Sequence, residues 1–365
     1  MERLQSIDTL RGITIIAMIL VNSPGTWDHV YPPLLHAEWH GLTPTDLIFS
    51  TFLYIIGISI VLAYRKSKIH NKKKYKKISI RSLKIFGLGL LINFITPIFP
   101  FVEDLDNVRI LGVLQRIGII FCFSSFIFFN LNTKKIVIII AVILIGYYLF
   151  TGFFILPNGC IPTFENSTEN WVNFLDRHII GSNHMWKPSH EPEGILSTLP
   201  SMTSSLLGIL AGKILTSNHS VKNKGLQLIY FSIFLLISGY LWSIWFPINK
   251  TMWSSSYALV TAGWASLILS TIYFFNTFKK ISTPKVSEYV SKNAIVIYFL
   301  SMVTTKFFYI IQIDDKQNIH SWIFNSIFLG INNLKLASLT YAIFVVAFYL
   351  FLAYLLYIKK IFIKI

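Results

Sequence analysis

The sequence predicts an all-α protein whose helices cross a membrane several times. Hydrophobic residues make up 54% of the 365-residue chain and charged residues only 13%, and the mean hydropathy is +0.60. This composition lies far outside the range of soluble globular domains. Apolar runs of about 20 residues, the length that spans a bilayer, recur along the whole chain. We therefore expect a polytopic transmembrane helical bundle of about ten helices that forms one domain over residues 1–365.

The expected helices follow one another with polar connections between them. They cover residues 7–23, 44–64, 78–99, 109–130, 134–153, 194–215, 226–246, 252–276, 287–311 and 336–358. The first run lacks a small-residue cleavage site, which indicates a retained helix and not a signal peptide. The second opens with Thr43-Pro44, residue types that favour a helix start. The two cysteines, Cys122 and Cys160, predict neither a disulfide framework nor a metal site.

The net charge is +16, and most of the cations lie in alternate connections between the apolar runs. The connection over residues 65–77 is rich in lysine, and Lys134 and Lys222 lie in further connections on the same side. The opposite connections hold few cations. Because lysine and arginine are enriched on the cytoplasmic side of membrane proteins, both termini are expected there, with extracytoplasmic loops at about 24–43 and 153–193. The basic excess is thus a topology signal, and nucleic acid is not an expected partner.

The break between the first two runs concentrates groups capable of acid–base chemistry. It holds His36 and His40, and Asp46 follows at the start of the second run. A histidine suits general acid–base catalysis near neutral pH, and a carboxylate can fix its tautomer. Two alternatives stay open: the imidazoles form an interfacial belt with Trp39, and Asp46 only favours the helix start. No metal is expected, because Ala37 stands where the zinc-protease motif needs glutamate.

Further polar residues interrupt the apolar runs. Asn22 ends the first run, where an amide can end a helix or stabilise a developing oxyanion. Arg109 and Arg116 fall within about 60° of each other on the fourth run. Arg109 can snorkel outward, whereas Arg116 lies deeper and needs an anionic partner. Small residues such as Ser201 line one face of the sixth run, which favours helix packing or a narrow ligand slot, with Lys213 placed to meet a phosphate.

Several short sequence motifs follow one another along the chain in a characteristic order. They cover residues 3–12, 18–22, 36–46, 109–116, 191–194 and 208–213, with Asn293 in the ninth run. In these motifs the chain resembles the heparan-alpha-glucosaminide N-acetyltransferase family and its bacterial relatives, within a wider class of membrane acyltransferases. The similarity spans nearly the whole chain. The resemblance implies transfer of an acetyl group from cytoplasmic acetyl-CoA to an amino sugar on the far side of the membrane.

The resemblance also implies roles for individual residues. His36 matches the outward-facing histidine near which the family holds the thioester, Asn22 matches the neighbouring catalytic amide, and we expect Asp46 to orient His36. Cofactor contacts are expected from Arg116, Arg109, Arg11, Lys213 and Ser201, with Arg81 and Lys84 as further candidates. Acceptor contacts are expected from Trp39, His40, His184 and Glu193.

Three departures from the family pattern leave the acceptor open. His40 stands where the animal enzyme has Asn, Glu191 replaces an Asp, and Ser301 replaces a His. We expect an acetyl-CoA-dependent N-acetyltransferase for a terminal glucosamine or another amino sugar, with many passes through a bacterial cytoplasmic (inner) membrane. Its partners are then acetyl-CoA, the acceptor glycan and the lipid bilayer, and a homodimer stays open.

Two alternative functions stay beside this expectation. The same machinery would suit an O-acetyltransferase of a cell-envelope glycan. From another class, a transporter or flippase of a sugar-linked lipid would also place arginines inside the membrane. The sequence shows no internal repeat of the kind that many transporters have, which counts against transport.

Overall fold

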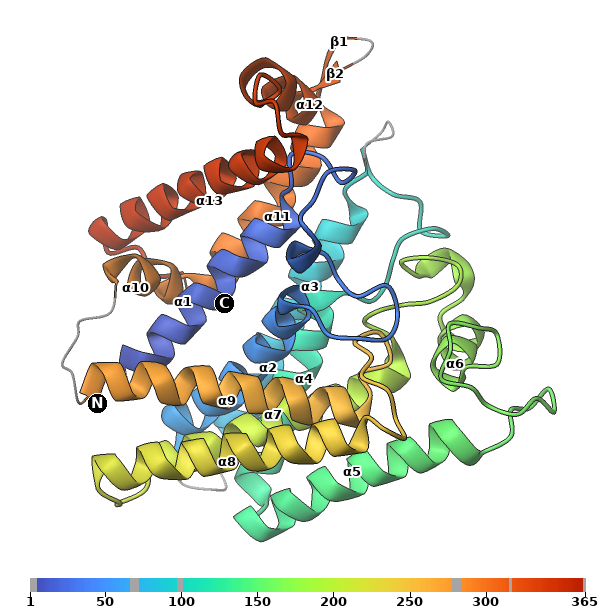
Figure 1. The fold of residues 1–365 in the computed structure, drawn as a ribbon, viewed down its shortest axis with the longest axis vertical. Coiled ribbons are helices and arrows are strands. Elements are labelled where there is room, and N and C mark those ends of the chain that lie inside the picture. Colours follow the sequence, from blue (N-terminus) through green and yellow to red (C-terminus); the bar gives the residue numbers. More distant parts are fainter. Residues whose placement is uncertain (1–4, 66–71, 97–100, 278–283, 315–316, 364–365) are drawn as a thin grey trace.

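The computed structural model describes residues 5–65, 72–96, 101–277, 284–314 and 317–363, and its regular secondary structure is almost entirely helical (Figure 1). The α-helices are α1 (Gln5–Asn22), α2 (Pro44–Tyr64), α3 (Lys72–Phe94), α4 (Val113–Asn130), α5 (Thr133–Phe153), α6 (Trp171–Ile179), α7 (Ile195–Leu215), α8 (Val221–Trp242), α9 (Ser255–Thr277), α10 (Lys285–Lys292), α11 (Ala294–Ile310), α12 (Ile319–Ile323) and α13 (Leu334–Ile358). Shorter elements are the 3-10 turns Pro32–Leu34 and Ser182–His184, the π-turn Phe324–Phe328, and an antiparallel pair of strands, β1 (Gln312–Asp314) and β2 (Gln317–Asn318).

The predicted all-α class is confirmed, and each of the ten predicted runs contains a helix. The expected number of ten spans is not confirmed. Within the described residues, seven helices are long and apolar enough to cross a membrane, namely α2, α4, α5, α7, α8, α9 and α13. The pair α10 and α11 would make an eighth, but it is bent by 81° around Asn293. α1 carries Asp8 and Arg11, and α3 begins among lysines, which makes both less apolar.

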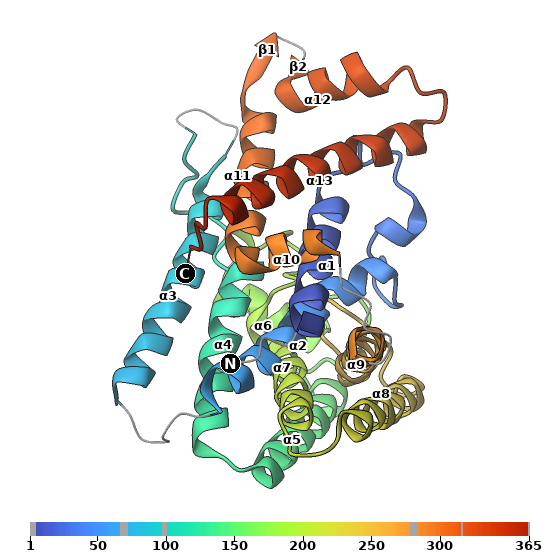
Figure 2. The same ribbon diagram turned by 90° about the vertical axis from the view of Figure 1, so that its left-hand side faces the viewer.

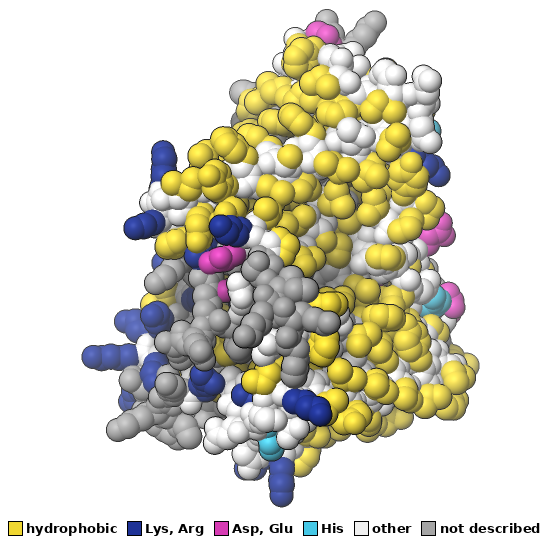
Figure 3. All heavy atoms as spheres, turned by 60° about the vertical axis from the view of Figure 1, so that its left-hand side comes forward, with side chains coloured by type: hydrophobic (Ala, Val, Ile, Leu, Met, Phe, Trp, Pro, Cys, Tyr) yellow, Lys and Arg dark blue, Asp and Glu magenta, His cyan; other side chains and the backbone are white. Residues whose placement is uncertain are grey.

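The bundle presents one basic end and a broad apolar surface. α1 begins and α13 ends on the side that faces the viewer in Figure 2. Lys and Arg side chains gather along the left and lower edge of the face in Figure 3, whereas apolar side chains cover most of its right-hand part. Only 22% of the membrane-length segment of α8 is buried within the protein, so its outer face suits contact with lipid. The cytoplasmic position of the termini stays a prediction, and residues 66–71 of the lysine-rich connection lie outside the described residues.

α2 and α7 pack against each other with their backbones in near contact. A Cβ atom on Gly208 would lie 2.0 Å from the carbonyl oxygen of Tyr54, and one on Gly57 would lie 1.9 Å from that of Ser205. Only glycine permits so close an approach at these positions. The glycines of α7 therefore serve close helix packing, and Ser201 on the same helix is fully buried.

Three connections meet at the end of the bundle where α1 ends and α2 begins. The indole Nε1 of Trp39, in the connection between α1 and α2, donates to the carbonyl oxygen of Phe164 at 2.8 Å. The backbone N–H of Gly41 donates to the carbonyl oxygen of Ile248 at 2.8 Å. The first contact reaches the connection between α5 and α6, and the second reaches that between α8 and α9. The polar break thus lies against two other loops, on the right of Figure 1.

Candidate active site

A histidine and a buried carboxylate form a close pair at the first turn of α2. Oδ1 of Asp46 lies 2.7 Å from Nδ1 of His36. Oδ2 of Asp46 accepts the backbone N–H groups of Ala37 at 3.2 Å and Thr43 at 3.0 Å. Asp46 is completely buried, whereas 49% of the His36 side chain is exposed. Asp46 is therefore a fixed acceptor for the Nδ1–H of His36, which leaves the lone pair on Nε2.

This geometry combines two roles that the sequence left as alternatives. Asp46 receives the N–H of Thr43, the residue before α2, as a carboxylate at a helix start does. The same carboxylate also holds the imidazole of His36. The hydrogen bond at the start of α2 fixes the carboxylate of Asp46, and the fixed carboxylate then orients the imidazole ring of His36.

A lysine that the sequence analysis did not select reaches the same imidazole. Nζ of Lys250, from the connection between α8 and α9, lies 3.0 Å from Nε2 and 3.1 Å from Nδ1 of His36. Burial lowers the pKa of Lys250, while the negative charges of Glu193 and Asp46 oppose that shift. The one sequence signal was that Lys250 is among the few cations of the connections opposite the lysine-rich ones.

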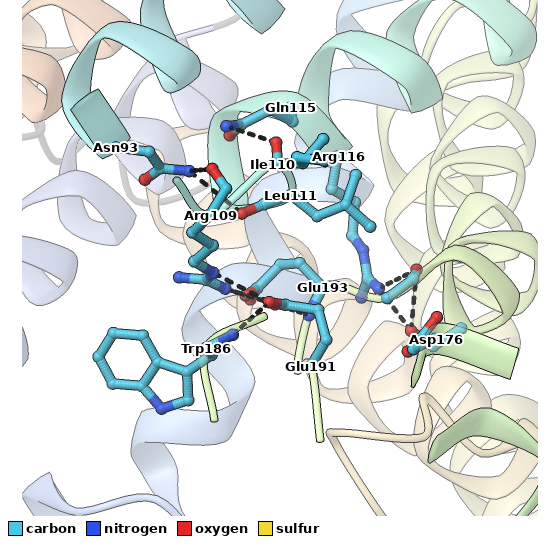
Figure 4. A network of polar contacts seen from close by, with 12 residues as sticks. Asn93, Arg109, Ile110, Leu111, Gln115, Arg116, Asp176, Trp186, Glu191 and Glu193 are labelled. Atoms are coloured by element: carbon cyan, nitrogen blue, oxygen red, sulfur yellow. Dashed lines mark hydrogen bonds and ion pairs between the residues drawn. The ribbon is translucent and has the colours of Figure 1, made fainter. Parts of the chain in front are cut away.

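Arg109 binds two buried carboxylates that lie on the same side of its guanidinium group (Figure 4). Its Nε donates to Oε2 of Glu191 at 3.0 Å, and its Nη2 contacts Oε1 of Glu191 and lies 2.7 Å from Oε2 of Glu193. The guanidinium carbon stands 5.1 Å from the ring centre of Trp186. Burial would lower the pKa of Arg109, but the two carboxylates raise it overall. Arg109 and Glu193, predicted to contact cofactor and acceptor, are thus paired with each other.

Arg116 is buried inside the bundle without a carboxylate at ion-pair distance among the described residues. Its Nη2 donates to the carbonyl oxygen of Gly194 at 3.0 Å and to Oγ of Ser197. Its guanidinium carbon stands 5.3 Å from the ring centre of Trp253. Asp176 of α6 is drawn beside this group in Figure 4, and burial raises the pKa of Asp176 to about 7. The expected anionic partner therefore does not contact Arg116 among the described residues, and Glu193, Glu191 and Asp176 attract it only from further away.

The other predicted residues occupy three surroundings. Trp39 and His40 lie in the joined loops, where Nε2 of His40 stands 3.3 Å from Oε1 of Glu165. Nδ1 of His184 lies 2.8 Å from the carbonyl oxygen of Val108, before α4. Asn22 donates to the carbonyl oxygen of Met18 in its own helix at 2.9 Å. Among the described residues, no hydrogen bond joins His36 to Asn22 or His184.

A cavity of about 660 Å³ lies beside the second part of α2. Its wall includes Phe52 and Tyr64 of α2, and helices α1, α3, α4, α10 and α11 complete it. Five cations line it, namely Arg11, Lys77, Arg81, Lys84 and Lys292. Of the five residues expected first to contact the cofactor, Arg11 is the one that lines this cavity. Lys213 lies elsewhere and donates to Oγ1 of Thr133. Its size is typical of small-molecule pockets.

The fold and these sites define a multi-pass membrane protein that has an Asp–His pair at one end of α2 and a basic cavity along its other end. Residues 3–246 match the family model described as heparan-alpha-glucosaminide N-acetyltransferase, catalytic, and the chain belongs to this family.

Two curated relatives align with the whole chain. The chain is 30% identical to the human heparan-alpha-glucosaminide N-acetyltransferase and 27% identical to the mouse protein of that name, each over an alignment 422 residues long. Both alignments cover 100% of the chain but 60% of the human and 61% of the mouse protein. The chain thus spans about three fifths of the length of these relatives.

Proposed function

We propose that this protein is a membrane N-acetyltransferase that moves an acetyl group from cytoplasmic acetyl-CoA to a terminal glucosamine or another amino sugar on the opposite side. The observation that carries the proposal is the Asp46–His36 pair, whose geometry leaves a basic nitrogen exposed at the end of the bundle. The relatives named for acetyl transfer to an amino sugar support the reaction class. The whole chain would form one acyltransferase domain in a bacterial cytoplasmic membrane.

In the proposed reaction His36 acts as the general base. The acceptor amine donates its proton to Nε2 as its nitrogen attacks the acetyl carbonyl carbon, while Asp46 stabilises the imidazolium that forms. The C–N bond forms, the C–S bond breaks, and the proton passes from His36 to the departing thiolate. Alternatively, Nε2 first accepts the acetyl group and passes it to the amine. Asn22 would polarise the carbonyl once its amide turns away from Met18.

The basic cavity would hold the nucleotide part of the donor. Its wall combines the cations Arg11, Arg81 and Lys84 with apolar side chains such as Phe52, which suits a ligand with phosphates and a long thin arm. Phe52 and Asp46 are six residues apart on α2, or about 9 Å along the helix axis. An arm lying beside α2 would therefore bring its thioester end from the cavity toward His36. Arg116, Arg109, Lys213 and Ser201 lie outside the cavity wall, so the proposal for phosphate contacts rests on Arg11, Arg81 and Lys84.

The acceptor would approach from the joined loops. Trp39 presents an aromatic edge to His190, with ring centres 5.9 Å apart, and His40 lies next to Trp39. Both residues come from the segment that carries His36, so a sugar bound there would lie close to the basic nitrogen. Glu193 and His184 would act indirectly, because their side chains contact Arg109 and Val108.

Acetyl transfer in proteoliposomes tests the proposal. The full chain should convert glucosamine and acetyl-CoA to N-acetylglucosamine and free CoA, and His36→Ala should lower kcat by about 100-fold or more, as the loss of a general base does. His29→Ala, a change in the same connection, is the matched control and should keep normal activity. A His36→Ala variant with unchanged kcat would show that the pair is not the catalytic centre. Coenzyme A should raise the melting temperature of both variants, because each keeps the cavity.

A further inference from the structure

The turn that carries Lys250 is held by buried groups. Asn249 is completely buried, its Oδ1 accepts the N–H of Met252 at 2.8 Å, and its own N–H donates to Oγ of Ser254 at 3.0 Å. Trp253 is buried and has a φ of +52°, a left-handed conformation that bulky residues adopt only when their surroundings impose it. Several buried contacts thus hold the turn in one conformation, and this conformation places Lys250 near His36.

The amine of Lys250 has the imidazole of His36 as its close partner. Nδ1–H of His36 donates to Asp46, so Nε2 carries the lone pair. Nζ of Lys250 lies 3.0 Å from Nε2 and 3.1 Å from Nδ1, which places it over the face of the imidazole. Among the described residues, no carboxylate lies within 4.0 Å of this Nζ. Asp46 and Glu193 attract it from further away, Arg116 repels it, and burial lowers the pKa of Lys250. The amine is therefore a donor without an anion in contact.

The position of this donor matters for the proposed reaction. An acceptor amine deprotonated by His36 must come within hydrogen-bonding distance of Nε2 in the plane of the ring, and Nζ of Lys250 lies 3.0 Å from the same nitrogen, over the face of the ring. The acetyl carbonyl carbon must then stand about 3 Å from the acceptor nitrogen. The carbonyl oxygen consequently falls within a few ångströms of Nζ. A hydrogen-bond donor at such a place stabilises the negative charge that develops on the oxygen.

We infer that Lys250 is a catalytic residue whose Nζ–H group turns from the imidazole of His36 to the acetyl carbonyl oxygen and stabilises the oxyanion. The inference rests on the proposed acetyl transfer. As the acceptor nitrogen bonds to the carbonyl carbon, its proton goes to Nε2 and the negative charge resides on the oxygen beside Lys250. When the C–S bond breaks, the charge passes to the thiolate. Lys250 forms no covalent bond, and it lies beyond residue 246, where the family match ends.

Kinetics of Lys250→Met in proteoliposomes provide the first test. The change keeps an unbranched side chain but removes the donor, so kcat should fall roughly 100- to 1,000-fold, the loss typical of removing one oxyanion donor. KM values for acetyl-CoA and glucosamine should change little, and coenzyme A should still raise the melting temperature. Lys250→Arg, which keeps an N–H donor, should restore part of kcat. Lys187→Met, at an exposed lysine of another loop, is the control.

A second test measures the contact between Lys250 and His36 without relying on catalysis. Diethyl pyrocarbonate modifies unprotonated imidazole nitrogens, so His36 should react severalfold faster in Lys250→Met than in the wild type. His40 serves as the internal reference for mass spectrometry of the modified peptides. An unchanged rate at His36, or a kcat within threefold of the wild type while the wild type acetylates glucosamine, would overturn the inference alone. A wild type that acetylates no amine would overturn the proposed function, and the inference with it.

Discussion

The substitution Asp46→Asn separates the two roles of this residue. An asparagine can keep its oxygen toward the N–H groups of Ala37 and Thr43, and its NH₂ group then faces Nδ1 of His36. The opposite orientation would turn the NH₂ group toward both backbone N–H groups, at about 1–3 kcal/mol for each donor left unsatisfied. The first orientation requires only that Nδ1 accept a hydrogen bond, since Nζ of Lys250 lies over the ring and does not block a proton on Nε2. It should therefore prevail.

This orientation changes the tautomer of His36. With Nδ1 as the acceptor, the proton resides on Nε2, and the lone pair needed by the acceptor amine is gone. In a serine protease the same change lowers kcat about 10⁴-fold, so we expect a fall of about 10³- to 10⁴-fold here. The loss of one charge-assisted hydrogen bond should cost about 1.5–3 kcal/mol of unfolding free energy.

The assay measures kcat for glucosamine acetylation in proteoliposomes and the melting temperature in detergent. Asp28→Asn, at an exposed carboxylate of the same connection, is the control and should change neither quantity. If Asp46 only stabilises the helix start, Asp46→Asn lowers the melting temperature but leaves kcat within about threefold of the wild type. That result would refute the tautomer argument.

Three further predictions concern the cavity, the helix contact and a buried acid. Arg81→Ala should raise KM for acetyl-CoA severalfold with little change in kcat, because Arg81 lines the cavity away from His36; an unchanged KM would contradict the phosphate assignment. Gly208→Ala should lower the unfolding free energy by about 1–3 kcal/mol, since its Cβ would meet the Tyr54 carbonyl oxygen, whereas Gly146→Ala has open space and should not destabilise the protein. Burial raises the pKa of Asp176 from 3.8 to about 7. The unfolded state therefore loses this proton first, and the melting temperature should fall as pH rises from about 4 to about 7. Asp176→Asn should remove that part of the fall, and an identical pH profile would contradict the assignment.

Much of the helical pattern could be predicted because a bilayer imposes one length on every span. The runs at 44–64 and 134–153 match α2 and α5 within a residue. The bend between α10 and α11 could not be predicted from hydropathy, because both halves are compatible with one span. The side chain of Asn293 there bonds the backbone of Ile361 and Ile363, a contact made by residues distant along the chain.

The same distinction holds in the candidate site. His36 and Asp46 are ten residues apart around one helix start, so local spacing was enough to pair them. Lys250 lies 214 residues from His36, and Arg109 lies 82 residues from Glu191. Such pairs depend on which helices pack together, which periodicity does not specify. The sequence therefore predicted an anionic partner for Arg116 and an outward-reaching Arg109, whereas in the structure the two carboxylates contact Arg109.

The backbone contact of α2 and α7 bears on how an acetyl group would cross the membrane. Helices that touch at Gly57 and Gly208 have no side-chain layer between them that could shear, so rocking of one against the other would break that contact. A transporter exposes its site to the two sides in turn by such movements. Under the proposed function this protein would need no such cycle. The helices would stay in place, the arm of the donor would reach the site from one side, and only the acetyl group would cross while both substrates remained on their own sides of the membrane.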